Sequence, residues 1–238
     1  MRICFIAAGA FTHIKSYLEF FKSAGHDVHF IAISPGPEYN VPTYNLGIGT
    51  NYSETNGKWK YPLSMLPARR IVRSLKPDIV HAHYATSAGL TAFCCGHHPT
   101  LVTVHGSDLT TNINSLIWKF LLTRIFNFAD MINTVSPQLR SLALDLDIDP
   151  EKIFNLTPGI NTERFNFRVR DRIEPGNKIK MICTRNISST YDNETIVEAL
   201  ALIKKNNIPF QMTFAAAGSD LEKIKNQVAY LGLTDSVV

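Results

Sequence analysis

The chain has 238 residues, of which 45% are hydrophobic, and a formal net charge of +4. This length and apolar content allow at least one ordinary core and predict one or two domains. The modest charge is compatible with an anionic ligand or membrane surface, and the absence of a Lys/Arg block interleaved with aromatic residues argues against nucleic-acid binding.

Short apolar runs alternate with longer segments of helical periodicity. The predicted strands of the first part are Arg2–Ala8, His26–Ile33, Asp78–His83, Thr100–His105, Met131–Val135 and Lys152–Leu156. The predicted helices are Phe11–Ala24, a segment through Arg69 and Leu75 to Pro77, Thr86–Cys95, Ser115–Phe128 and a segment that begins at Pro137. Strands that alternate with helices predict right-handed βαβ crossovers and a parallel sheet.

Two turn-rich stretches interrupt this alternation. Ser34–Tyr61 predicts a long irregular segment, of the kind that is usually functional or mobile, and Asn166–Lys178 predicts a linker. The alternation then resumes: strand Ile179–Thr184, helix Asp192–Lys205, strand Pro209–Ala216, helix Ser219–Leu231 and the start of a third strand at Ser236–Val238. We therefore expect a first domain over residues 1–166, a linker over 167–177 and an incomplete second domain over 178–238, so that the chain is a piece of a longer protein.

The four cysteines predict buried thiols in a reducing compartment rather than a disulfide framework. Cys94 and Cys95 are adjacent, and Cys4 and Cys183 lie inside apolar runs. The apolar start of the chain reaches its small residues too early for a signal peptide, and no apolar run approaches the ~20 residues of a membrane helix. We expect a cytoplasmic enzyme.

Three clusters of metal-ligand residue types have simpler explanations. His81 and His83 share one face of a strand, but no third ligand follows at a diagnostic spacing. Cys94–His98 fits a helix terminus better than a zinc site. Within Asp145–Asp149 a calcium loop is disfavoured, because Pro150 stands where such a loop needs glycine, and a helix-ending turn is favoured.

The helix predicted over Ser115–Phe128 carries apolar residues at helical spacing, at positions 117, 120, 121, 125 and 128. Trp118, Lys119, Phe120 and Arg124 give it an apolar and basic character. A core helix with two solvated charges is the favoured interpretation. The alternative is a face that contacts a membrane surface, as in some peripheral enzymes.

Ligands of open α/β sheets bind beyond the carboxyl ends of the strands, so the residues that follow each strand are candidates for a site. Gly9 follows the first strand, where it either permits a tight turn or brings the backbone close to a ligand. No G-x-G-x-x-G turn is present there, which disfavours a nicotinamide dehydrogenase. Arg185 follows the strand that opens the second part, where its guanidinium can bind a diphosphate.

The strongest local candidate is His105-Gly106-Ser107-Asp108, directly after another strand. We expect the imidazole of His105 to point into the crevice, and the backbone N–H groups that follow to be open. A neutral imidazole there can donate to a sugar hydroxyl or to a developing charge. A hydrogen-bonded histidine in a turn is the alternative interpretation.

Seven segments, in this order and spacing, resemble the GT4 family of retaining glycosyltransferases, although none is specific alone: Ala8-Gly9, Ala24–Val28, Asp78–His83, Thr103–Gly106, Ala129–Ser136, Pro158–Asn161 with Phe165, and Cys183–Arg185. The resemblance implies a GT-B fold, in which two Rossmann-like α/β domains face each other and hold the acceptor on the N-terminal and a nucleotide sugar on the C-terminal domain. It further implies transfer to a glycan or lipid-linked acceptor with retention at the anomeric carbon, without a cofactor or a divalent metal.

Carried onto this sequence, the resemblance gives roles to single residues. His105 would touch the donor sugar as the catalytic candidate, Gly9 would lie near the donor phosphates, and Arg185 would bind the diphosphate. The remaining candidates for the acceptor side or the cleft are His83, Gly106, Ser107 and Asp108, and the segment Ser34–Tyr61 would help to select the acceptor.

The sequence also departs from the family pattern. Tyr191-Asp192 stands in the region where a Lys-Gly pair is common, so diphosphate binding would depend more on Arg185. The family's Glu-x7-Glu segment would lie beyond Val238, so we expect the chain alone to be inactive. The alternatives are a GT-B sugar-nucleotide epimerase, which shares the architecture, and a non-catalytic fragment that acts as a binding partner. The expected location is the cytoplasm or the cytoplasmic face of the membrane.

Overall fold

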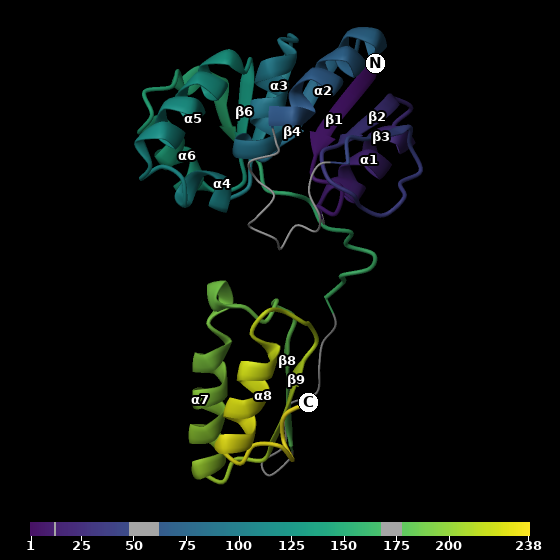
Figure 1. Ribbon diagram of the computed structural model, residues 1–238. Coiled ribbons are helices and arrows are strands. Elements are labelled where there is room, and N and C mark those ends of the chain that lie inside the picture. The colour runs from purple at the N-terminus through teal and green to yellow at the C-terminus, as the bar shows by residue number, and fades with distance from the viewer. Residues whose placement is uncertain (12, 48–61, 168–177) are drawn as a thin grey trace. The chain divides into compact units, whose positions relative to one another are not determined.

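The computed structural model describes residues 1–11, 13–47, 62–167 and 178–238. They form two compact units, Met1–Asn161 and Thr162–Val238, each with parallel strands and helices (Figure 1). Residues 168–177 of the predicted linker and residues 48–61 of the predicted irregular segment lie outside the described residues.

The first unit is built on a parallel sheet of seven strands in the order β3-β2-β1-β4-β5-β6-β7. The strands are β1 (Arg2–Ala7), β2 (Asp27–Ala32), β3 (Thr43–Asn45), β4 (Ile79–His83), β5 (Thr100–Val104), β6 (Met131–Thr134) and β7 (Ile153–Asn155). The predicted parallel α/β sheet is therefore confirmed. Strand β3 lies within the segment predicted to be irregular, and its three residues are too few to give a periodic signal.

The helices of the first unit follow the predicted order. They are α1 (Ile14–Ser23), α2 (Pro62–Leu75), α3 (Leu90–Cys95), α4 (Ser107–Thr110), α5 (Leu116–Phe128) and α6 (Pro137–Leu144). The predicted single helix Thr86–Cys95 is a π-helical turn, Ala85–Gly89, followed by α3. The turn is closed by the bond from Gly89 N to the carbonyl oxygen of Tyr84 at 2.8 Å.

Two cores lie on the two faces of this sheet, because successive side chains of a strand point to opposite faces. Cys4 and Ile6 of β1 belong to the larger core, which α2, α3 and α5 cover. Phe5 of β1 belongs to the smaller core, together with Ile14 and Leu18 of α1. Figure 1 accordingly shows α1 on the opposite side of the sheet from α2, α3 and α5.

Helix α5 buries only part of the predicted apolar set. Ile125 is fully buried as expected, together with Leu122 and Phe126, which were outside that set, whereas Ile117 is 72% exposed and Phe120 61% exposed. The prediction is wrong for those two residues because apolar residues occur on most sides of this helix, so that periodicity does not single out one face.

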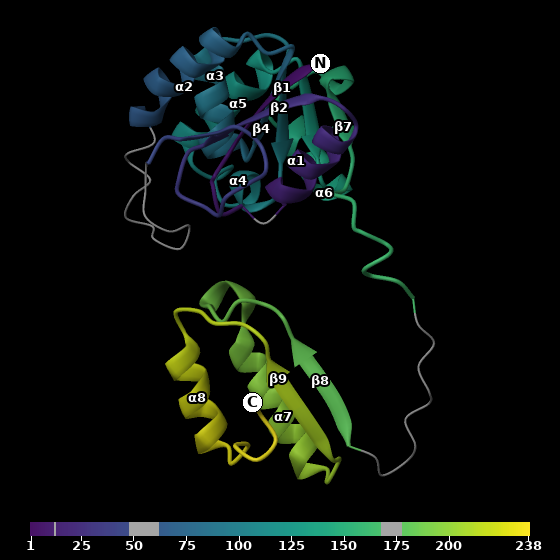
Figure 2. The same cartoon turned by 90° about the vertical axis from the view of Figure 1, so that its right-hand side faces the viewer.

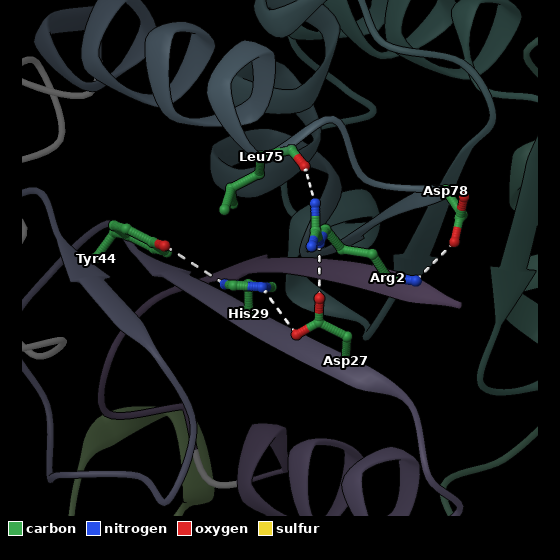
Figure 3. A network of polar contacts seen from close by, with 6 residues as sticks. All are labelled: Arg2, Asp27, His29, Tyr44, Leu75 and Asp78. Atoms are coloured by element: carbon green, nitrogen blue, oxygen red, sulfur yellow. Dashed lines mark hydrogen bonds and ion pairs between the residues drawn. The ribbon is translucent and has the colours of Figure 1, made fainter.

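A polar network joins the strands at their amino ends (Figure 3). Arg2 Nε donates to the carboxylate of Asp27 at 2.7 Å, and Arg2 Nη1 donates to the carbonyl oxygen of Leu75 at 2.7 Å. The backbone N–H of Arg2 donates to Asp78 at 2.6 Å, and His29 Nε2 lies 3.1 Å from Asp27. The hydrogen bond from Arg2 lowers the pKa of Asp27. These bonds connect β1, β2 and the turn between α2 and β4, at the end of the sheet away from the predicted site.

The second unit repeats the strand–helix alternation on a smaller scale. It contains β8 (Ile179–Cys183), α7 (Asn193–Lys205), β9 (Phe210–Phe214) and α8 (Leu221–Tyr230), with β8 parallel to β9 (Figure 2). Val237 pairs with Met212 of β9 as an isolated parallel bridge, which Phe214 N extends by donating to the carbonyl oxygen of Val238 at 2.8 Å. The last residues thus lie where a third parallel strand was predicted.

A row of histidines at the candidate site

The predicted site residues of the first unit lie at one edge of the sheet. Strands β1, β4 and β5 are neighbours and run parallel, so their carboxyl ends meet. Gly9 follows β1, His83 ends β4, and His105 follows β5. The sheet therefore brings together residues that are 22 to 96 positions apart in the sequence.

His81, His83 and His105 form a continuous row of rings. His83 Nδ1 lies 3.1 Å from His105 Nε2, and the ring centroids of His81 and His83 are 4.2 Å apart. His81 Nε2 lies 2.8 Å from the hydroxyl oxygen of Thr103 on the adjacent strand. The prediction that His81 and His83 share one face of β4 is confirmed, and the link from His83 to His105 was not anticipated.

Burial keeps this row uncharged at neutral pH. It lowers the pKa of His81 to about 3, with a smaller contribution from His105. Burial also lowers the pKa of His83 well below its usual value, and the neighbouring histidines add to the shift. The pKa of the partly buried His105 falls to about 4, through burial and then through His13. The row can therefore donate and accept hydrogen bonds, but it supplies no positive charge.

Aromatic side chains surround His105. Phe11 meets it edge-on at a centroid distance of 4.7 Å, Tyr84 stacks on it at 5.2 Å, and His13 lies nearly parallel to it at 6.1 Å. Tyr84 has a φ of 81°, a conformation that is rare for a bulky residue and is associated with functional sites. Phe11, His13 and Tyr84 were not predicted as site residues: Tyr84 directly follows the predicted strand Asp78–His83, whereas Phe11 and His13 lie at the start of the helix predicted over Phe11–Ala24.

Asp108 shapes the loop after β5 through backbone hydrogen bonds. Its side chain is buried, and its carboxylate accepts the N–H groups of Ala85 at 2.9 Å, Gly106 at 2.8 Å and His105 at 3.2 Å. The expectation that the backbone N–H groups after His105 are open is therefore wrong for Gly106, since the carboxylate of Asp108 accepts its N–H as well as that of His105. Gly106 has a φ of 141°, which a residue with a side chain rarely adopts, and Ser107 begins α4.

Gly9 is explained by a close approach of two loops. The loops after β1 and β2 cross there, and Gly9 N donates to the carbonyl oxygen of Ser34 at 3.1 Å. A Cβ on Gly9 would lie 2.1 Å from that oxygen, and a Cβ on Gly36 would lie 2.1 Å from the carbonyl of Gly9. Tyr39 donates to the carbonyl oxygen of Gly9 at 2.6 Å. The geometry thus supports a packing role for Gly9, and contact with a ligand stays a prediction.

Arg185 belongs to the second unit, where it follows β8 as predicted. It is exposed, and its guanidinium carbon lies 5.4 Å from the ring centroid of Tyr191. A loop crossing comparable to that of Gly9 occurs nearby, because a Cβ on Gly218 would lie 1.9 Å from the carbonyl oxygen of Ile187. The buried Asn193 fixes the same loop by donating to the carbonyl oxygen of Asn186 at 3.1 Å.

Two of the three clusters considered for metal binding lie at helix ends, and the third, His81 and His83, lies in β4. Gly96 ends α3 with a left-handed φ of 65°, Asp145 caps the end of α6, and Asp149 accepts the N–H of Glu151 at the start of a 3₁₀ turn. Within the described part of the chain, no three His, Cys, Asp or Glu side chains are grouped so that they could hold a metal ion.

A cavity of about 250 Å³ lies between the ends of α2 and α3, away from the histidine row, and is lined by Arg69, Val72, Arg73, Lys76, Pro77, Cys95, Gly96 and His97. The described helices include none with the length and apolar content that a membrane span requires.

Comparisons with known proteins agree with this architecture. Residues 7–164 match the model of the family described as Glycosyltransferase Family 4. Over 149 residues the chain is 22% identical to the GDP-mannose-dependent alpha-(1-6)-phosphatidylinositol monomannoside mannosyltransferase of Mycolicibacterium smegmatis. That match covers 60% of this chain but 39% of the relative, so the chain spans well under half of that protein's length.

Solved structures resemble the whole chain. The sucrose-phosphate synthase of Thermosynechococcus elongatus has a TM-score of 0.75 and 15% identity, covering 100% of this chain and 69% of that one. The Anabaena protein HepE, in complex with UDP and glucose, has a TM-score of 0.72 and 12% identity, covering 100% of this chain and 68% of that one. At these identities the likeness shows the fold alone.

Proposed function

Since the chain belongs to Glycosyltransferase Family 4 and has the GT-B type of α/β fold, we propose that its protein transfers a hexose from a nucleotide-sugar donor to an acceptor with retention at the anomeric carbon. The observation that carries the proposal is His105, a neutral imidazole held at the carboxyl end of β5 by His83 and by the Asp108 loop. A hydrogen-bond donor at that edge suits a sugar hydroxyl.

Individual roles follow the predicted pattern. His105 contacts the donor sugar, Gly9 lies near its phosphates, and Arg185 binds the diphosphate. The reaction uses neither a cofactor nor a divalent metal, because retaining GT-B transfer stabilises the leaving diphosphate with protein groups. HepE was solved with UDP and glucose, which supports a nucleotide-sugar donor here. Gly106 and Ser107 line the cleft, and the buried side chains of His83 and Asp108 support it from beneath the surface.

The acceptor is proposed to be a glycan or a lipid-linked sugar at the cytoplasmic face of a membrane. The name of the mycobacterial relative, which includes a phosphatidylinositol mannoside, supports a lipid-linked acceptor. Leu116, Ile117 and Phe120 are exposed on α5 beside the cations Lys119 and Arg124, which supports contact with anionic lipid. Flotation with anionic liposomes tests this contact, and absence of the protein from the lipid fraction rejects it.

The test of transfer uses the protein expressed from its natural open reading frame, whatever its length. We expect that His105→Ala and Arg185→Ala each lower transfer sharply. Matched controls are His98→Ala, an exposed histidine that pairs with Asp130, and Arg70→Ala on the exposed side of α2. Near-normal transfer in both site variants would reject the assigned roles.

Product analysis separates the proposed transferase from its alternatives. A transferase forms a new glycoside only when an acceptor is present, whereas a sugar-nucleotide epimerase releases a free sugar derivative without one. The 238-residue chain alone is expected not to turn over. Absence of both products from the natural full-length protein would favour a non-catalytic binding role.

A further inference from the structure

We propose that His83 is a positioning residue that holds His105 in the tautomer with its proton on Nδ1, so that the ring nitrogen of His105 facing the crevice is a hydrogen-bond donor. The meaning of this donor for sugar transfer rests on the proposed function. The placement of the proton rests on the geometry of the first unit alone.

The two ring nitrogens of His83 have different surroundings. Nδ1 lies 3.1 Å from Nε2 of His105. Nε2 is buried and has no hydrogen-bond partner among the described residues. The ring is completely buried beside Phe5, Phe11 and Tyr17, at centroid distances of 5.9, 6.0 and 4.6 Å. His83 is therefore fixed in place by apolar ring contacts and has one polar contact, with His105.

A single proton lies between His83 Nδ1 and His105 Nε2, because both rings are neutral. If His105 were the donor, His83 would carry its own proton on Nε2, and a buried N–H group would be left without an acceptor. If His83 is the donor, its Nε2 keeps only an unpaired lone pair. Unpaired buried donors are rarer and costlier than under-used acceptors, so the second arrangement is favoured.

Tyr17 does not reverse this preference. Its ring meets that of His83 at an interplanar angle of 67°, so an N–H pointing at the aromatic face is conceivable. Such a contact is a weak hydrogen bond and replaces only part of an ordinary one. On the other side His81 is already engaged, since its Nε2 pairs with the hydroxyl group of Thr103.

The donor in the His83–His105 hydrogen bond determines which ring nitrogen of His105 carries the proton. Because its Nε2 accepts from His83, the proton of the neutral ring must lie on Nδ1. His105 Nδ1 makes no hydrogen bond with a described residue, and it is not among the buried polar atoms that lack partners. It is therefore the accessible nitrogen, and it presents an N–H group suited to a hydroxyl or phosphate oxygen.

Histidine tautomers can be measured directly in the 238-residue chain. With ¹⁵N-labelled histidine, two-bond ¹H–¹⁵N spectra at neutral pH distinguish the protonated from the unprotonated ring nitrogen. We expect a protonated Nδ1 in both His83 and His105, with His105 assigned by the loss of its signals in His105→Gln. A proton on Nε2 of His105 in the parent chain overturns the inference.

Substitutions at His83 separate positioning from packing. His83→Phe keeps an aromatic ring but has no donor, so the His105 spectrum should shift to a mixture of tautomers. His83→Asn places an amide near the position of Nδ1 and should restore the parent pattern. Tyr17→Phe, which keeps the ring against His83, is the matched control and should leave the pattern unchanged. An unchanged His105 spectrum in a folded His83→Phe chain also overturns the inference.

Activity assays keep the two proposals apart. In the natural full-length protein we expect His83→Phe to lower kcat about tenfold with little change in KM, and His83→Asn to recover most of it. The Nδ1–H tautomer in a protein without transfer activity would reject the proposed function and leave the inference standing. Full transfer activity with a proton on Nε2 of His105 would support the proposed function and reject the inference.

Discussion

Replacing Asp108 by asparagine tests whether its carboxylate holds the site loop together. The carboxylate accepts three backbone N–H groups, from Ala85 at 2.9 Å, Gly106 at 2.8 Å and His105 at 3.2 Å. The amide of asparagine keeps an acceptor at only one of the two oxygen positions. Its NH2 group then faces the N–H of either Ala85 or Gly106, and at least one buried donor loses its partner.

The expected loss in the free energy of unfolding is about 2 kcal/mol. An unsatisfied buried donor costs ~1–3 kcal/mol, and the remaining bonds weaken because the acceptor is no longer charged. Burial works in the opposite direction, since it raises the pKa of Asp108 and is less costly for a neutral amide. The lost hydrogen bonds outweigh this relief, because three donors converge on one side chain.

Urea unfolding followed by tryptophan fluorescence measures the effect. Trp118 lies on α5 of the first unit, and the only other tryptophan of the sequence, Trp59, also precedes the second unit, so the signal reports the unit that contains Asp108. With a denaturant slope of ~1–3 kcal/mol per molar urea, the midpoint should fall by about 1 M. Asp149→Asn is the control, because Asp149 is exposed and accepts one N–H, that of Glu151. If the urea midpoint of Asp108→Asn differed from that of the parent chain no more than the midpoint of Asp149→Asn does, the reasoning would be refuted.

Two further predictions concern the same edge of the sheet. The pKa of His105 is about 4 in the folded chain, below the ~6.5 of an unfolded histidine. As the pH is lowered, the unfolded state therefore binds a proton first. The free energy of unfolding is fully present above the unfolded pKa and decreases, as the pH is lowered below it, by up to ~1.4 kcal/mol per pH unit for each such histidine. The urea midpoint should therefore drop between neutral pH and pH ~5, less steeply in His105→Asn, and a pH-independent midpoint would contradict this. Gly9→Ala should lower the urea midpoint strongly, because the new Cβ would lie 2.1 Å from the carbonyl oxygen of Ser34. Gly159→Ala is the control and should leave the midpoint unchanged, because a Cβ there would have nothing within 4 Å. Equal midpoints in the two variants would show that the loops after β1 and β2 separate easily.

The sheet could be predicted because its strands are short apolar runs separated by helices of ordinary length. Once the strands are predicted, the residues at or after their carboxyl ends, such as Gly9, His83 and His105, can be predicted as site candidates, because the carboxyl ends of parallel strands lie at the same edge of the sheet. The helix ends at Gly96 and Asp145 were also predictable, because glycine and turn-forming acidic residues end helices locally.

What could not be predicted depends on contacts between segments that are distant in the sequence. The pairing of His83 with His105 requires the register of β4 against β5, which puts His83 opposite Thr103. The sequence predicts Asp108 as a site residue, but in the structure its carboxylate accepts a hydrogen bond from the backbone N–H of Ala85, 23 residues earlier. The buried face of α5 was predicted only at Ile125, because apolar side chains surround most of that helix and only its packing partners select Leu122 and Phe126.

A neutral histidine row cannot offset the charge of a diphosphate. His81, His83 and His105 are uncharged near neutral pH, so the first unit offers hydrogen bonds at this edge rather than cations. Arg185 of the second unit is exposed after β8, and it forms no salt bridge with a carboxylate among the described residues. Under the proposed function the two units therefore supply different chemistry, a neutral donor for the sugar and a guanidinium for the phosphates.

This division predicts different defects in the two site variants of the natural full-length protein. Arg185→Ala should weaken binding of the nucleoside diphosphate about tenfold or more, and the effect should shrink as salt screens the charge. His105→Ala should leave this binding nearly unchanged, because a nucleoside diphosphate lacks the sugar, and should lower turnover instead. Isothermal titration at two salt concentrations, with whichever of UDP and GDP the parent protein binds, measures the first effect, and a transfer assay measures the second. If His105→Ala lost nucleoside diphosphate affinity as strongly as Arg185→Ala, the histidine would have to contact the phosphates, and the separation of roles argued from its neutral ring would be wrong.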